Sequence, residues 1–109
     1  MMSIVAVNDN NFNSAVPAQG TTLVEFGAVW CPPCKALLPI LDDLSNKHAE
    51  QLTVIKVDCD ESPATAGAFG VMSMPTVIVF QDGEPVEKLV GLRPQSVYES
   101  VLSKYIAAV

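Results

Sequence analysis

The order of strand-like and helix-like segments predicts a single α/β domain with a mixed sheet, spanning residues 1–109. Apolar runs of strand length alternate with segments of helical spacing, which favours parallel strands joined by right-handed crossovers. The last two strand-like runs are separated by a tight-turn sequence, which indicates an antiparallel hairpin. Half of the 109 residues are apolar, which is enough for one core, and the chain is too short for two domains.

The N-terminal third predicts a strand, a short helix and a buried strand. Residues 3–7 alternate loosely, as in a short strand. Asn8 or Asp9 is expected to cap a short helix that ends near residue 16, because both side chains accept hydrogen bonds from a first helical turn. Residues 21–28 have the apolar character of a buried strand.

The middle third predicts a long helix, a strand and a second short helix. Residues 36–49 carry leucine and isoleucine at a spacing that makes one apolar stripe. Pro39 falls inside this helix and is expected to kink it, because proline lacks a backbone donor and clashes with the preceding turn. Residues 52–57 are typical of a buried parallel strand, and residues 62–69 of a short helix.

The C-terminal third predicts a hairpin and a final helix. Residues 76–80 carry the strongest strand signal, and a turn at residues 81–84 leads to a returning edge strand at residues 86–91. Pro94 is expected to be the first residue of the last helix. The apolar side of that helix is predicted to consist of Val97, Val101, Leu102 and Tyr105.

Two thiols stand at the junction between a predicted strand and a predicted helix, where residues 30–35 read WCPPCK. Cys31 falls near the helix N-terminus, where free backbone N–H groups and the helix dipole favour a thiolate. The pair therefore predicts thiol–disulfide exchange. A pair of core thiols or half of a zinc site is the alternative, although a structural zinc needs four ligands and only Cys59 and His48 remain. His48 is expected to face solvent near the end of the helix.

The charge balance argues against nucleic-acid and membrane partners. The net charge is −6, and the six lysines and arginines are scattered, so no basic patch is visible. No apolar run approaches membrane-spanning length, and the first seven residues are too short for a signal peptide. We therefore expect a cytoplasmic protein, in a compartment where paired thiols are more often catalytic than structural.

Several short motifs are specific in combination. They are WCPPCK, the acidic residue in LVEF, the Lys56 strand, MPT, DG and VG, at residues 30–35, 23–26, 56, 74–76, 82–83 and 90–91. Together they resemble the thioredoxin family over essentially the whole chain. The resemblance implies a thioredoxin fold, with a central mixed sheet of about five strands flanked by four helices. Pro32, Glu25 and Gly27 depart from the glycine, aspartate and tryptophan that are usual in the family. A Cys-Pro-Pro-Cys centre is also similar to those of nucleoredoxin- and tryparedoxin-type proteins, which are typically longer.

The place of each thiol at the helix start predicts its role, and the resemblance implies the role of Glu25. Cys31 would be the nucleophile, and Cys34, one turn further in and expected to be more buried, would be the resolving thiol. Glu25 would accept the proton of Cys34, and burial should raise the pKa of its carboxyl to suit that task. A purely structural pair between Glu25 and Lys56 is the alternative.

Three prolines are expected to shape the loops around the thiols. Pro32 and Pro33 should stiffen the turn, and Pro32 is expected to shift the reduction potential relative to glycine. By the resemblance, Pro75 is a cis-proline that faces the disulfide. It would expose the Met74 backbone to an extended substrate segment.

An apolar face around Cys31 is expected to bind substrates, lined by Trp30, Met74, Gly91 and Cys59. Met72 is expected to pack in the core instead. Cys59 has two interpretations, a small apolar filler or a secondary redox handle. Neighbouring Asp58 and Asp60 should raise the pKa of its thiol and slow oxidation.

The sequence thus predicts an enzyme, a protein-disulfide reductase of the thioredoxin type, with no bound cofactor and no metal. The resemblance implies that electrons come from NADPH through a separate thioredoxin reductase, and that the substrates are disulfide-containing proteins. A monomer is expected. An oxidase or isomerase on the same fold, and a binding module in which the redox pair is idle, are the alternatives.

Overall fold

The computed structural model describes residues 4–107 and has the predicted order of elements. The strands are β1 (Ile4–Val7), β2 (Thr21–Gly27), β3 (Leu52–Asp58), β4 (Thr76–Gln81) and β5 (Glu84–Val90). The helices are α1 (Phe12–Ala15), α2 (Pro32–Lys47), α3 (Pro63–Ala68) and α4 (Gln95–Leu102). Ser3, the first residue of the predicted N-terminal strand, lies outside the described residues.

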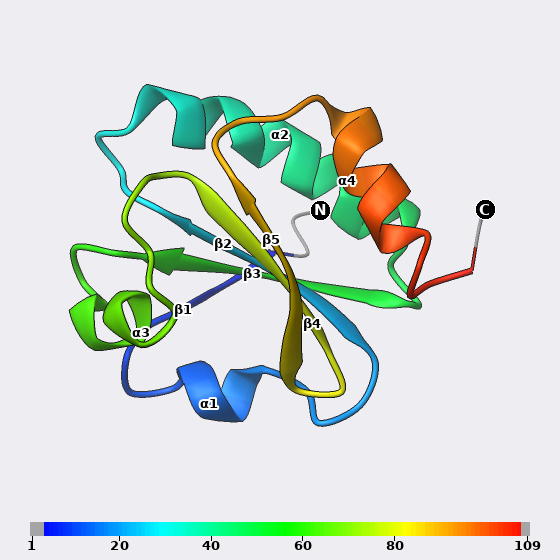
Figure 1. The fold of residues 1–109 in the computed structure, drawn as a ribbon, viewed down its shortest axis with the longest axis horizontal. Helices are drawn as coiled ribbons and strands as arrows, with labels where there is room; N and C mark the ends of the chain where they lie inside the picture. Colours follow the sequence, from blue (N-terminus) through cyan, green and yellow to red (C-terminus); the bar gives the residue numbers. More distant parts are fainter. Residues whose placement is uncertain (1–3, 108–109) are drawn as a thin grey trace.

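A five-stranded mixed sheet with the order β1-β3-β2-β4-β5 forms the centre of the molecule (Figure 1). The β1, β3 and β2 strands run parallel, and β4 pairs antiparallel with both β2 and β5. Every residue of the middle strand β2 is buried, whereas the edge strand β5 is largely exposed. A strand covered on both faces needs apolar residues at nearly every position, which explains the continuous apolar run seen in the sequence.

The helices cover the two faces of the sheet in pairs (Figure 1). α2 and α4 lie over one face and enclose a core that includes Leu23 and Tyr98. α1 and α3 lie over the other face, where Phe26 belongs to a core rich in phenylalanine. Successive strand residues point to opposite faces. Glu25, two residues after Leu23 in β2, is therefore placed on the side that α2 covers.

The N-cap prediction for α1 is wrong. Asn11 precedes this helix, and its side-chain oxygen accepts a hydrogen bond from the Asn8 backbone N–H at 2.8 Å. The Asp9 carboxylate instead accepts hydrogen bonds from the backbone N–H groups of Ala64 at 3.2 Å and Thr65 at 2.8 Å. Asp9 thus caps α3, and its bonds to Thr65 lower the pKa of its carboxyl.

Asp9→Ala is expected to loosen α3 selectively, because two backbone donors in the first turn of that helix lose their acceptor. Amide hydrogen exchange at Ala66 and Phe69, read by NMR, should quicken about fivefold while exchange in β2 stays unchanged. Glu61→Ala is the matched control, because this exposed carboxylate near α3 accepts no side-chain hydrogen bond within residues 4–107. Equal exchange rates in the two variants would contradict the capping role.

The prolines move two helix boundaries from their predicted places. α2 begins at Pro32 rather than at residue 36. Backbone N–H groups in the first turn of a helix have no acceptor within the helix, so proline, which lacks an N–H, is tolerated there. It ends at Lys47 rather than at residue 49. Pro39 lies inside α2, and the predicted kink stays a prediction. Pro94 is the N-cap of α4 and not its first helical residue, since its ψ of 152° is extended.

Two apolar side chains differ from their predicted burial. Met72 was expected in the core, but it is 95% exposed on the loop before β4. Tyr98, absent from the predicted apolar side of α4, is its most buried aromatic residue, and Tyr105 lies beyond the end of the helix. Tyr98 precedes Val101 by three residues and Leu102 by four, so its side chain and hydroxyl lie on the same side of the helix as theirs. In the fold that hydroxyl accepts a hydrogen bond from the Arg93 backbone N–H at 3.2 Å.

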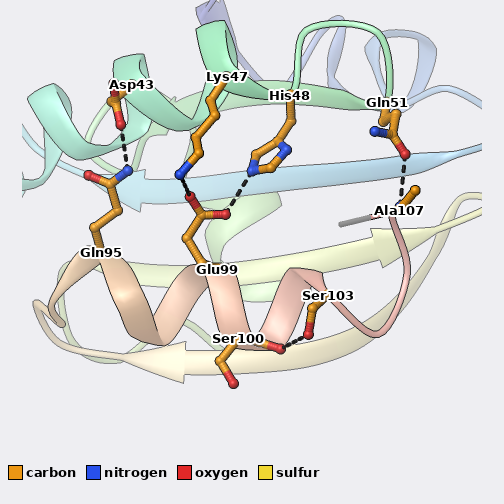
Figure 2. A network of polar contacts seen from close by, with 9 residues as sticks. All are labelled: Asp43, Lys47, His48, Gln51, Gln95, Glu99, Ser100, Ser103 and Ala107. Carbon is orange, nitrogen blue, oxygen red and sulfur yellow. Dashed lines mark hydrogen bonds and ion pairs between the residues drawn. The ribbon is translucent and has the colours of Figure 1, made fainter. Parts of the chain in front are cut away.

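A polar network joins α2 to α4 (Figure 2). Glu99 on α4 lies 2.8 Å from the Lys47 ammonium and 2.7 Å from Nε2 of His48. The prediction that His48 faces solvent is therefore wrong, because its ring is buried against Glu99. The two contacts, together with a hydrogen bond from Gln95 to Asp43, hold α4 beside α2 on the face where Glu25 lies.

Candidate active site

Cys31 and Cys34 form a disulfide at the start of α2, with their Cα atoms 5.2 Å apart. Cys31 is the N-cap residue, and its Sγ accepts a hydrogen bond from the backbone N–H of Cys34 at 3.3 Å. This N–H is one of the donors that a helix leaves free in its first turn. It therefore favours negative charge on the Cys31 sulfur. The predicted difference in burial is not present, since each cysteine is 4% exposed.

The loop before β4 closes over the two sulfurs. The Met74–Pro75 peptide bond is cis, and the Met74 carbonyl oxygen lies 3.9 Å from Cys31 Sγ. Met74 also packs against the cluster formed by Ala28 and the two cysteines. The Gly91 backbone N–H donates to the Pro75 carbonyl at 2.8 Å, which ties the end of β5 to this loop.

Exposed apolar side chains surround the disulfide. Trp30 is 60% exposed and Val29 is 74% exposed on the turn that leads into α2. The Trp30 indole N–H donates to the Asp60 carboxylate at 2.6 Å, which ties the ring to the loop after β3. Large exposed apolar residues beside a reactive centre are typical of a surface that binds other proteins. Val29, which was not expected at this surface, lies two residues before Cys31, and Met72 is exposed on the loop two residues before Met74.

Glu25 is a carboxyl in an almost wholly buried position, 3% exposed, on the face of β2 that α2 covers. Burial raises the pKa of this carboxyl to about 7, the Lys56 ammonium lowers it, and the Asp58 carboxylate raises it further. Lys56 stands opposite Glu25 in the parallel register of β2 and β3. The structural ion pair left open by the sequence is not formed, since the ion pairs within residues 4–107 join Lys47 and His48 to Glu99 and Lys104 to Glu87.

A cavity of about 400 Å³ adjoins the buried acid. Its walls include Glu25, Gly27 and Cys34 from β2 and α2, together with Lys56 and Asp58 from β3. The Glu25 carboxyl and the Cys34 side chain therefore line the same cavity. Gly27 and Asp58 were missed as part of this site. A glycine inside a buried strand was the available signal, because it often marks a close approach by another group.

Cys59 does not join the disulfide cluster. It lies just after β3 and packs against the phenylalanine-rich core between the sheet and α1 and α3. Burial, with the charges of Glu25, Asp58 and Asp60, raises the pKa of its thiol to about 11. The predicted influence of the two aspartates is present, but burial is the larger cause. At neutral pH the thiolate that oxidation requires is scarce.

Neither a metal centre nor a membrane span is found in the part of the chain that the structure describes. Between residues 4 and 107, no three side chains of histidine, cysteine, aspartate or glutamate gather as metal ligands would. Within the same residues, no helix combines the length and the apolar character needed to cross a membrane.

Comparison with known proteins agrees with this geometry. A family model described as thioredoxin matches residues 3–104. The thioredoxin of Staphylococcus haemolyticus is 46% identical to this chain over 105 residues, which cover 96% of this chain and all of that protein. The thioredoxins of Staphylococcus saprophyticus and Staphylococcus aureus are each 45% identical with the same coverage. With its helix-capping redox disulfide, the chain therefore belongs to the thioredoxin family of thiol–disulfide oxidoreductases.

Proposed function

We propose that the Cys-Pro-Pro-Cys centre reduces protein disulfides in two steps. The Cys31 thiolate attacks one sulfur of a substrate disulfide, so that a mixed disulfide forms and the other substrate sulfur leaves as a thiolate. Cys34 then loses its proton and attacks Cys31 Sγ, which releases the second substrate thiol. Two electrons pass to the substrate, and Cys31 and Cys34 are left as a disulfide. The position of Cys31 at the N-cap of α2 is the observation that carries this assignment.

Glu25 is the proposed proton acceptor for Cys34, with Lys56 in a supporting role. A carboxyl with a pKa of about 7 is half ionised at neutral pH, so it can both take up and return a proton there. Support also comes from the positions of Glu25 Oε2 and Cys34 Sγ, since both lie against Gly27.

The proposed substrate surface consists of Trp30, Met74, Pro75 and Gly91, and it leaves out Cys59, which packs against the phenylalanine-rich core. An extended substrate segment would pair antiparallel with the backbone at Met74, beside the Cys31 sulfur. The exposure of Trp30 and the 3.9 Å separation of the Met74 carbonyl from Cys31 Sγ support this arrangement. Pro32 and Pro33 are proposed to tune the reduction potential by restricting the turn between the thiols.

We further propose that the chain acts as a single domain, as a cytoplasmic monomer without a bound cofactor. A separate thioredoxin reductase would renew the dithiol with electrons from NADPH. This completes a cycle in which the reductase supplies the two electrons that each substrate disulfide consumes.

The equilibrium reduction potential of the Cys31–Cys34 pair tests the proposed direction of electron flow. Equilibration against glutathione buffers, with alkylation of the free thiols, should give a potential near roughly −270 mV, which suits an electron donor. NADPH oxidation by a bacterial thioredoxin reductase should then depend on the chain and on insulin as a disulfide substrate. A potential near roughly −180 mV or above would contradict the proposal, because that range belongs to isomerases and oxidases.

A further inference from the structure

Gly27 is a glycine without a conformational reason to be one. It closes the buried strand β2, where glycine weakens the strand and offers no side chain to the core. The glycines with a positive φ in residues 4–107 are Gly20, Gly70, Gly83 and Gly91. Because the Gly27 backbone lies outside that left-handed region, an alanine would meet no torsional strain there. The reason for glycine must be the space that a side chain would occupy.

That space is taken by the two reacting groups. A Cβ atom at Gly27 would overlap Oε2 of Glu25, and it would lie 3.1 Å from Sγ and 3.2 Å from Cβ of Cys34. Glu25 and Gly27 are two residues apart in β2, so they share the face that α2 covers. Elsewhere in the described chain, a Cβ added at Gly67 would meet nothing within 4 Å.

The backbone at Gly27 cannot easily move to make room. Its carbonyl accepts a hydrogen bond from the Cys59 backbone N–H at 2.8 Å, and Gly27 is paired with Asp58 in the parallel register of β2 and β3. An added methyl group would therefore displace a side chain rather than the strand. Cys34 is held at the start of α2, so the Glu25 carboxyl would be the group that moves.

We propose that Gly27 is a positioning residue: the absence of its side chain creates the space in which the carboxyl of a glutamate lies beside Cys34 Sγ. This inference rests on the proposed role of Glu25 and deepens it. A glutamate carries its carboxyl one methylene further than an aspartate does, and the vacancy at Gly27 receives that extra length. The two departures from the usual family residues, Glu25 and Gly27, are thus one steric arrangement.

The test compares Gly27→Ala with the double variant Gly27→Ala/Glu25→Asp, whose shorter acid vacates the contested space. The readout is the single-turnover rate of insulin disulfide reduction by the reduced protein between pH 5 and 9. Ionisable groups around the carboxyl are Lys56 and Asp58 on β3, Cys34 and Lys35 on α2, Glu61 and Cys59 after β3, and Tyr98 on α4. None of these is altered in either variant.

Gly27→Ala should slow the reaction roughly ten- to a hundredfold at pH 7.5, and it should shift the pH at which the rate rises. The double variant should recover most of the rate. Gly67→Ala, on the exposed side of α3, is the matched control and should leave the pH profile unchanged. A wild-type profile in Gly27→Ala, or a double variant no faster than Gly27→Ala, would overturn the proposal.

A separate measurement distinguishes this inference from the role of Glu25. NMR titration of the residue-25 carboxyl in Gly27→Ala should give a pKa that differs from that of the unaltered protein, and an unchanged titration would overturn the positioning role. If Glu25→Gln instead kept the wild-type pH profile, the proposed role of Glu25 as proton acceptor would be wrong. The NMR titration would still test whether Gly27 positions the residue-25 carboxyl. If Gly27→Ala does not fold, folding of the double variant supports the proposal. Failure of both variants to fold overturns it, since the space would then serve something other than the carboxyl.

Discussion

Cys34→Ser is expected to stop turnover and to trap a substrate on Cys31 as a stable mixed disulfide. Without the second thiol, nothing within the active centre attacks the Cys31 sulfur after the first exchange. Turnover with insulin should fall by about a thousandfold or more, as when an essential nucleophile is removed. The physical basis is the helix start, where the Cys34 backbone N–H donates to Cys31 Sγ and keeps that sulfur reactive in the variant.

Non-reducing gels and mass spectrometry would identify the trapped complex and the cysteine that carries the substrate. Cys31→Ser is the matched variant, and it should lose turnover to a similar extent without trapping any substrate. Dithiothreitol should release the substrate from the Cys34→Ser complex, which confirms that the link is a disulfide. Trapping by Cys31→Ser instead would reverse the assignment of nucleophile and resolving thiol.

Glu25→Gln is expected to stabilise the oxidised protein at alkaline pH. Burial raises the pKa of Glu25 from 4.5 to about 7, so the folded protein holds a proton that the unfolded chain releases. Stability is therefore lost as pH rises from about 4.5 through 7, where the buried carboxyl must ionise. The neutral glutamine avoids that ionisation, and the unfolding free energy at pH 8 should rise by about 3 kcal/mol.

Urea unfolding of the oxidised protein at pH 4 and pH 8 would measure this effect. The difference between Glu25→Gln and the unaltered chain should be small at pH 4, where the Glu25 carboxyl is mostly neutral in both the folded and the unfolded states. Glu84→Gln is the control, because Glu84 is an exposed carboxylate at the start of β5 and should give no such gain at pH 8. An equal difference at the two pH values would show that packing, not ionisation, separates the variants.

Features that depend on neighbours along the chain could be predicted from the sequence. The apolar runs of β2 and β4 and the helical spacing of α2 have their own periods, so the element order followed from local patterns. The redox pair was equally local, because two thiols separated by two residues at a helix start are close in any fold that keeps that helix. The first residues of α2 and α4 were predicted wrongly, at Pro32 and Pro94, because proline suits both the position before a helix and its first turn.

Only the tertiary structure decided the contacts between residues that are far apart in the chain. Asp9 caps α3 rather than α1, and His48 is buried by Glu99 on α4. Glu25 and Cys34 likewise lie close together at Gly27 only because α2 packs over the face of β2 that carries Glu25 and Gly27. The sequence alone determined which chemistry the chain carries, because the two thiols and their helix are contiguous. The fold decided which carboxyl meets them, because side chains from separate elements come together only when the crossovers and the sheet register set their distance.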